Sequence, residues 1–119
     1  MHDIQFLKDN GIDIDKSLEL LGDVETYDDI LEEFYQNIGD RKKKIEEFFK
    51  NSDLGNYAIE VHALKSDSKY LGFVLLADMA LEHQMKSEAN DMEYISSHYD
   101  DLMSEIDKVI GIVKNYLEG

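Results

Sequence analysis

Apolar residues recur three or four positions apart along most of the chain, which is the spacing that puts side chains on one face of an α-helix. The first such stripe, within residues 24–50, consists of Tyr27, Ile30, Leu31, Phe34, Ile38, Ile45, Phe48 and Phe49. The last stripe consists of Ile95, Leu102, Ile106, Val109, Val113 and Leu117. Both stripes predict long amphipathic helices, and Gly39 is expected to bend or split the first helix.

Two more helices are predicted between those stripes, at residues 54–70 and 73–88. The first of them follows a polar turn in which Asn51, Ser52 and Asp53 are residue types that favour a helix start, and Gly72 permits a break between the two helices. The polar residues 89–91 are expected to end the second helix and to start the next.

A shorter helical segment, residues 1–22, precedes these helices and is expected to form one or two short helices at an end of the molecule. Short turns between long helices make consecutive helices run in opposite directions. We therefore predict an all-α fold in one domain, residues 1–119. Its main part is an antiparallel up-and-down four-helix bundle over residues 24–117.

Composition narrows the classes of function. The chain contains no cysteine, which excludes disulfides, thiolate metal sites and a cysteine nucleophile. Its formal net charge of -15 argues against nucleic acid and anionic membrane surfaces, because both require a basic face. The longest apolar run, residues 73–77, is too short to span a bilayer, and the N-terminal residues show no signal-peptide pattern. We expect a cytoplasmic protein whose partner is a protein or a small ligand.

A histidine with two lysines is the most distinctive group on the predicted helix at 54–70. Lys65 lies one turn after His62 and Lys69 lies two turns after it, so the three side chains share one face of the helix. The apolar residues of the same stretch fall on the opposite side of the helix. His62 is therefore predicted to face solvent.

Three roles are open to such a histidine: metal ligand, general base, or nucleophile. Helical metal sites often place a glutamate three residues before the histidine, but Ile59 occupies that position. A general base needs a substrate pocket and an orienting carboxylate, which the sequence does not reveal. A phosphorylated imidazole would bear about two negative charges, which Lys65 and Lys69 would stabilise. The nucleophile hypothesis explains more of the neighbouring residues than the other two roles do. On composition alone, the simpler interpretation that these residues form only a solvated surface is still favoured.

The stretch HALKSDSKYLG, residues 62–72, resembles the signature of histidine-containing phosphotransfer (HPt) domains. That signature has a histidine, an apolar residue and a lysine in one helical turn, then a small residue, and a glycine ten positions after the histidine. Residues 11–37 are similar to the family's entry segment, and LLADMALEHQ, residues 75–84, is similar to the helix after the glycine. The resemblance covers nearly the whole chain.

This resemblance implies that His62 is phosphorylated and that Lys65 supports the phosphoryl group, with Lys69 as a second cation nearby. Ser66 occupies a position where the family usually has glycine, and we expect its small side chain to donate to a phosphoryl oxygen. Gly72 matches the family's later glycine, where helix packing is tight.

Other polar residues are given lesser roles. Across the hairpin at the glycine, Gln84 is expected to lie level with the phosphoacceptor and to hydrogen-bond near it. His83 and His98 are interpreted as packing residues, and His2 as terminal. The basic run at residues 41–44 is either a solvated helix end or a docking patch, with the solvated interpretation favoured.

The function implied is a phosphorelay carrier of two-component signalling. His62 would accept a phosphoryl group from the phospho-aspartate of a receiver domain and pass it to another receiver. The implied partners are response-regulator receiver domains and a sensor or hybrid histidine kinase. Mg²⁺ belongs to the receiver, so this domain is expected to hold no cofactor and no metal. Because the chain has no nucleotide-binding motif, we expect no kinase activity of its own and do not class it as an enzyme.

Two alternatives remain. One is a helical docking or adaptor module that keeps the HPt fold without transferring a group. The other is the dimerisation and phosphoacceptor region of a histidine kinase, whose motif usually has an acidic residue directly after the histidine and a proline soon afterwards. Here Ala63 follows the histidine and the chain has no proline. That kinase region is built from two chains, whereas this chain predicts four long helices of its own, so we expect a monomer.

Overall fold

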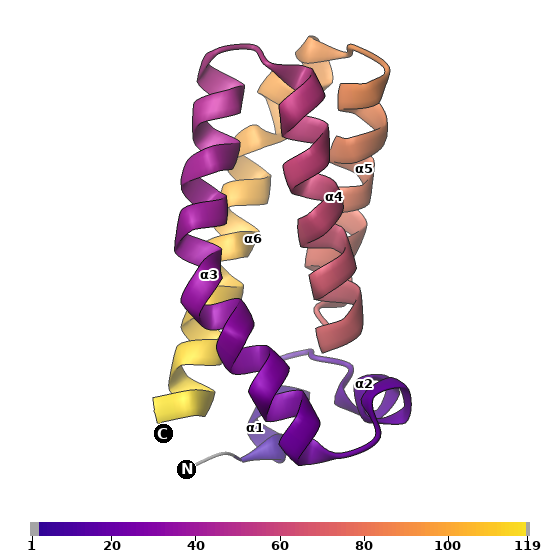
Figure 1. Cartoon of the computed structure of the whole chain (residues 1–119), viewed down its shortest axis with the longest axis vertical. Coiled ribbons are helices and arrows are strands. Elements are labelled where there is room, and N and C mark those ends of the chain that lie inside the picture. Colours follow the sequence, from indigo (N-terminus) through magenta and orange to yellow (C-terminus); the bar gives the residue numbers. More distant parts are fainter. Residues whose placement is uncertain (1–2, 119) are drawn as a thin grey trace.

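The structure, a computed structural model, describes residues 3–118 and is helical throughout its regular elements. The elements in chain order are α1 (Ile4–Asp9), α2 (Ile14–Leu21), α3 (Val24–Lys50), α4 (Leu54–Leu71), α5 (Val74–Glu88) and α6 (Met92–Glu118) (Figure 1). The all-α fold class and the order of the predicted helices are confirmed. Gly39 was expected to bend or split α3. The split is wrong, because the helix continues unbroken through that residue, while the bend stays a prediction. A single interior glycine costs only about 1 kcal/mol, which the packed stripe on both sides of it offsets.

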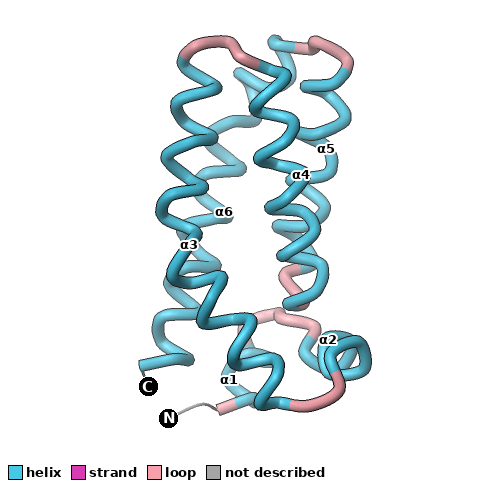
Figure 2. The backbone as a smooth tube through the Cα atoms, viewed as in Figure 1, coloured by secondary structure: helices cyan, strands magenta, loops and turns pink. Residues whose placement is uncertain are grey.

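The four long helices lie side by side, and the short turns between them reverse the direction of the chain (Figure 2). Each long helix packs against two others: α3 and α5 each contact both α4 and α6. The shorter helix α1 contacts α2 and α6, while α2 contacts α3 and α4. The two short helices therefore close one end of a molecule whose extents are 41 × 24 × 21 Å.

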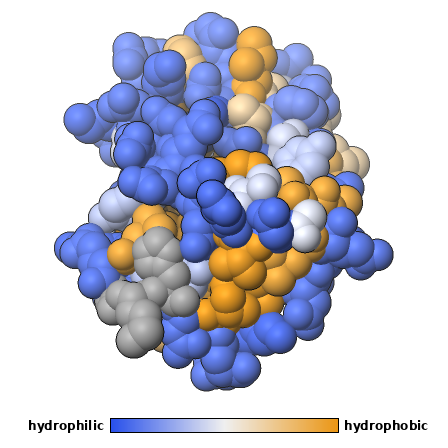
Figure 3. Space-filling view, turned by 60° about the horizontal axis from the view of Figure 1, so that its bottom comes forward, coloured by the Kyte–Doolittle hydropathy of each residue, from blue (hydrophilic) through white to orange (hydrophobic). Residues whose placement is uncertain are grey.

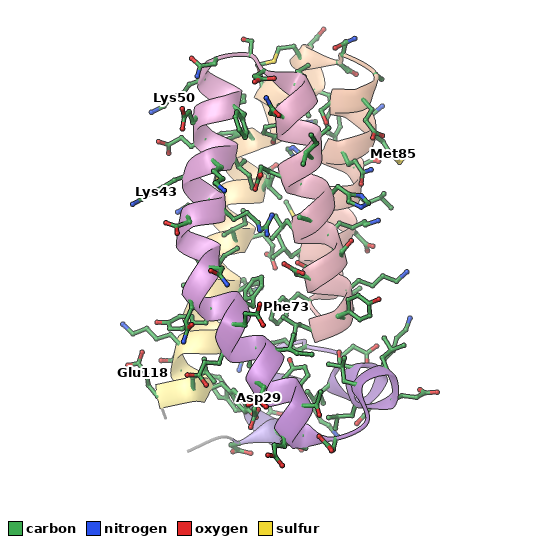
Figure 4. The ribbon with its side chains drawn as sticks, in the orientation of Figure 1. Asp29, Lys43, Lys50, Phe73, Met85 and Glu118 are labelled. Carbon is green, nitrogen blue, oxygen red and sulfur yellow. The ribbon has the colours of Figure 1, made fainter. Side chains whose placement is uncertain are left out.

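Aspartate side chains begin every helix except α5. Each accepts a hydrogen bond from a backbone N–H in the first turn, and the capping residues are Asp3, Asp13, Asp23, Asp53 and Asp91. Such caps satisfy N–H groups that have no partner within the helix. By contrast, α5 follows Phe73, labelled in Figure 4, with no side-chain cap. The Phe73 ring packs edge-on against the Phe34 ring, at 5.3 Å between centroids.

The turn between α4 and α5 is fixed by close backbone contacts around Gly72. This glycine has φ +85°, and a Cβ there would lie 2.6 Å from the carbonyl oxygen of Asp13. The Asp13 N–H donates to the Gly72 carbonyl at 2.9 Å, and the buried Tyr27 hydroxyl donates to the Leu71 carbonyl at 2.8 Å. The tight packing expected at Gly72 is therefore present, and it holds α2 and α3 against the end of α4.

The end of the molecule near α2 bears apolar side chains on its surface (Figure 3). Leu20 and Val24 are exposed on the segments that form it. Among the described residues, no helix has both the length and the apolar character that crossing a membrane requires.

Candidate functional site

His62 lies near the middle of α4, on the side of the helix that faces solvent. Its side chain is exposed, while Val61 and Leu64 on the same helix are completely buried. The prediction that His62 faces outward is confirmed. The reason is the one that the sequence pattern indicated: the apolar residues of α4 face its neighbours, and the opposite face remains in water.

Gln84 of α5 holds the His62 ring across the groove between the two helices. His62 Nδ1 lies 3.0 Å from Gln84 Oε1, and Gln84 Nε2 donates to Glu88 Oε2 at 3.4 Å. Because a carboxylate only accepts hydrogen bonds, the NH₂ group of Gln84 faces Glu88 and the Gln84 side-chain oxygen faces the histidine. Nδ1 therefore donates its proton to Gln84. In the neutral ring, Nε2 then has the free lone pair, and the ring orientation is set from a neighbouring helix.

A shallow hollow of about 500 Å³ lies beside this pair, between α4 and α5. Ile59 and His62 line it from α4, and Gln84 and Glu88 line it from α5. The Ile59 side chain is 64% exposed, and Met85, on the outer side of α5, is 54% exposed (Figure 4). An exposed apolar side chain that lines a surface hollow, as Ile59 does here, is typical of surfaces that bind another protein.

The predicted cations lie further along α4 than this hollow. Lys65 is half-buried and Lys69 is exposed, and both line a separate cavity toward the C-terminal end of the helix. Ser66 is half-buried. Within residues 3–118, neither lysine forms an ion pair. The two lysines therefore lie on α4, one and two turns from His62, and neither ammonium group is paired with a carboxylate of the described residues. The His62 ring itself is hydrogen-bonded to Gln84.

The remaining histidines have structural surroundings. His83 is 1% exposed, and its Nδ1 lies 2.8 Å from the hydroxyl of Tyr57. Burial lowers the pKa of His83 to about 4, with a smaller contribution in the same direction from His98. His98 is half-buried, donates from Nδ1 to the Tyr94 carbonyl at 2.9 Å and stacks on the Tyr94 ring. The interpretation of His83 and His98 as packing residues is confirmed, while His2 lies outside the described residues.

The basic run at residues 41–44 divides into two kinds of side chain. Arg41 lies 3.2 Å from Glu60 on α4, and Lys42 pairs with Asp107 on α6. Lys43 and Lys44 are exposed, and Lys43 points outward in Figure 4. The run is therefore partly a set of contacts between helices and partly solvated, which neither of the two expectations fully described.

Two interactions near the site were missed by the sequence analysis. Glu88 lies four residues after Gln84, a helical spacing at which side chains meet, so its contact with the amide could have been anticipated. The hydrogen bond between Tyr57 and His83 had no such signal, because it depends on which faces of α4 and α5 come together.

Within residues 3–118, no group of three or more histidines, aspartates or glutamates is placed to hold a metal ion. In comparisons with known proteins, no family model, no curated protein and no solved structure matches the chain. The geometry around His62 and the resemblance of residues 62–72 to the HPt signature are therefore the observations that bear on function.

Proposed function

We propose that this chain is a histidine-containing phosphotransfer domain in which the four long helices form an antiparallel up-and-down bundle and His62 is the phosphoacceptor. It would act in the cytoplasm as a monomeric carrier between receiver domains of response regulators and a sensor or hybrid histidine kinase. It would not phosphorylate itself from ATP. In this proposal it is a phosphotransfer intermediate and not an enzyme.

One observation carries the proposal: His62 is exposed on a long helix with Nδ1 bonded to Gln84, and within residues 3–118 its Nε2 has no hydrogen-bond partner. A nucleophile that must enter the active site of another protein needs a lone pair on the outward side and a fixed ring orientation. A histidine that only fills space needs neither feature.

The transfer step follows from that arrangement. The Nε2 lone pair attacks the phosphorus of a receiver's aspartyl phosphate, so an N–P bond forms while the P–O bond to the aspartate breaks. The aspartate leaves as a carboxylate. Nδ1 keeps its proton and continues to donate to Gln84, so no separate base is required. The receiver supplies the Mg²⁺, and the reverse sequence passes the group to a second receiver.

The neighbouring residues support the same role. Lys65, Lys69 and the hydroxyl of Ser66 would stabilise the charge on the phosphoryl group, each exposed ionic contact being worth about 1 kcal/mol or less. That amount biases a transfer equilibrium without driving it. The exposed side chains of Ile59 and Met85 would contact the receiver around the histidine.

The direct test is to incubate the chain with a receiver domain that has been phosphorylated with labelled phosphate. We expect label to move onto the chain in an acid-labile, base-stable form, as for phosphohistidine, and His62→Gln to abolish it. Label that persists in the His62→Gln variant would assign the phosphoacceptor to another residue and would refute the proposal.

A second test concerns the cation one turn from the histidine. Lys65→Ala should slow transfer by about three- to tenfold, because one charge that stabilises the phosphoryl group is lost. Circular dichroism should show unchanged helicity, since the ammonium group has no ion pair to lose. Lys8→Ala, on the remote helix α1, is the matched control and should transfer at the parent rate. Equal rates for both variants would remove Lys65 from the mechanism.

The apolar side chains around His62 also suit a second candidate, a docking module that binds a receiver without accepting its phosphoryl group. The same labelling experiment separates the two functions. Receiver binding without label on His62 would favour the docking module.

A further inference from the structure

A second cavity lies at the junction of α2, α4 and α5, away from the hollow beside His62. Its volume is about 360 Å³, and it is lined by three lysines, Lys16 from α2 and Lys65 and Lys69 from α4. Neither His62 nor Gln84 lines it. Cavities of this size hold small organic ligands.

The charge of this cavity is unusual for the chain. The protein has 27 acidic and 12 basic side chains, yet three lysines line this one cavity. None of the three forms an ion pair in the part of the chain that the structure describes. Two carboxylates, Asp13 and Asp78, also line the cavity. Three lysines against two aspartates leave the formal charge of the lining positive, which favours an anion.

A buried hydroxyl without a partner gives an independent indication of a ligand. Ser68 is completely buried, it lines the cavity, and its Oγ makes no hydrogen bond within the described structure. Leaving a buried hydroxyl without a partner costs free energy, so most such groups are bonded. An oxygen of a bound anion would accept the hydrogen bond that Ser68 has available.

The start of α5 forms an apolar wall of the cavity. Val74, the first residue of α5, lines the cavity, and its N–H donates to the Gly72 carbonyl at 3.0 Å. Ala77 and Leu81 continue this wall along the same helix, on which Asp78 also lines the cavity. The cavity therefore combines a cationic side with an apolar side.

We propose that this cavity binds a small phosphate monoester with a short apolar body. The phosphate accepts hydrogen bonds from Ser68 and from the ammonium groups of Lys16, Lys65 and Lys69. The apolar body rests on Val74 and Leu81. This inference does not depend on phosphotransfer at His62, because the two proposed sites share only Lys65 and Lys69. Lys16 and Ser68 belong to this cavity alone.

The test is a titration of the full chain with phenyl phosphate, followed by ¹H–¹⁵N NMR of backbone amides. We expect saturable shifts at Ser68, Gly72 and Val74, with a dissociation constant of about 1 mM or below. Inorganic phosphate lacks the apolar body and benzoate has a single charge, so both should bind at least about fivefold more weakly. Shifts that do not saturate, or equal affinity for the three compounds, would overturn the proposal.

Variants identify the residues that bind the probe. Lys16→Ala and Ser68→Ala should each weaken phenyl phosphate binding by about three- to tenfold. Lys8→Ala is the matched lysine control, because Lys8 pairs with Asp15 at 3.1 Å outside the cavity. This control and His62→Gln should bind with unchanged affinity. Unchanged binding in both Lys16→Ala and Ser68→Ala would overturn the proposal.

Thermal unfolding shows whether the Ser68 hydroxyl has an internal role instead. Because the hydroxyl has no hydrogen-bond partner among the residues that the structure describes, the melting temperature of Ser68→Ala should equal or exceed that of the parent protein. A lower melting temperature together with parent affinity for phenyl phosphate would show that the hydroxyl supports the fold and not a ligand. If His62→Gln abolishes transfer but keeps phenyl phosphate binding, the two sites are independent, as proposed.

Discussion

Two neighbouring residues of α5, His83 and Gln84, each form a hydrogen bond to α4, and the two bonds lie in opposite environments. Gln84 binds the exposed ring of His62, whereas His83 is itself buried and bonded to Tyr57. In both histidines, Nδ1 therefore has a hydrogen-bond partner. The difference is in what surrounds the rest of the ring, which is solvent for His62 and packed side chains for His83.

A hydrogen-bonded histidine is therefore not by itself a functional one. Burial disfavours the charged form of His83 and lowers its pKa to about 4, so the ring is neutral at physiological pH and inaccessible to another protein. Exposure leaves Nε2 of His62 open to a partner. Accessibility, and not the type of residue, separates the proposed phosphoacceptor from a residue of the core.

The largest expected effect is the contrast between substituting the two histidines. His62→Gln should abolish transfer from a phosphorylated receiver, while His83→Gln should retain it, because the buried ring never meets the receiver. Phosphate labelling of both variants, with folding checked by circular dichroism, makes the measurement. If a folded His83→Gln variant took up no label while His62→Gln was still labelled, His83 and not His62 would be the phosphoacceptor.

The second effect concerns stability and pH. The pKa of His83 falls from 6.5 to about 4 on folding, so between these values the unfolded chain binds more protons and acid favours unfolding. The stability present above pH 6.5 should fall by about 2 to 3 kcal/mol as the pH drops to about 4. Urea unfolding at several pH values measures this.

His83→Gln should flatten that pH dependence, because glutamine can still bond to Tyr57 but does not titrate. His62→Gln is the control, since it removes an exposed histidine. It should keep the dependence of the parent protein. A slope that is the same in all three proteins would show that His83 does not cause it.

A smaller loss is expected when the partner of the buried histidine is removed. Tyr57→Phe leaves His83 Nδ1 without its hydrogen bond in the core, which should lower the free energy of unfolding by about 1 to 3 kcal/mol. Tyr70→Phe removes the same hydroxyl from an exposed side chain and should change stability by less than about 0.5 kcal/mol. Equal effects in chemical denaturation would contradict the structural role of the buried bond.

The smallest effect on stability is expected at the exposed bond. Gln84→Ala should change the free energy of unfolding by less than about 0.5 kcal/mol, yet slow transfer by about two- to fivefold, since nothing then fixes the His62 ring. Gln84→Glu keeps an acceptor for Nδ1–H and should recover most of the rate. A stability loss in Gln84→Ala as large as that of Tyr57→Phe would erase the distinction between the two bonds.

Much of the fold follows from local pattern. The stripes of apolar residues predicted the four long helices, and the polar turn at residues 51–53 and Gly72 marked where helices begin and end. The outward direction of His62 followed from the same periodicity, because 3.6 residues per turn determine which side chains share a face. Such features depend on residues close together in the chain, so a sequence is sufficient to locate them.

Contacts between helices were decided only by the tertiary structure. The hairpin predicted that Gln84 lies level with His62, but the bond from Tyr57 to His83 and the cavity around Ser68 depend on the rotation of α2, α4 and α5 about their axes. A helical sequence specifies its own faces and leaves open which face of a neighbour they meet. That choice comes from packing the whole core, and it separates a histidine in water from one that is buried.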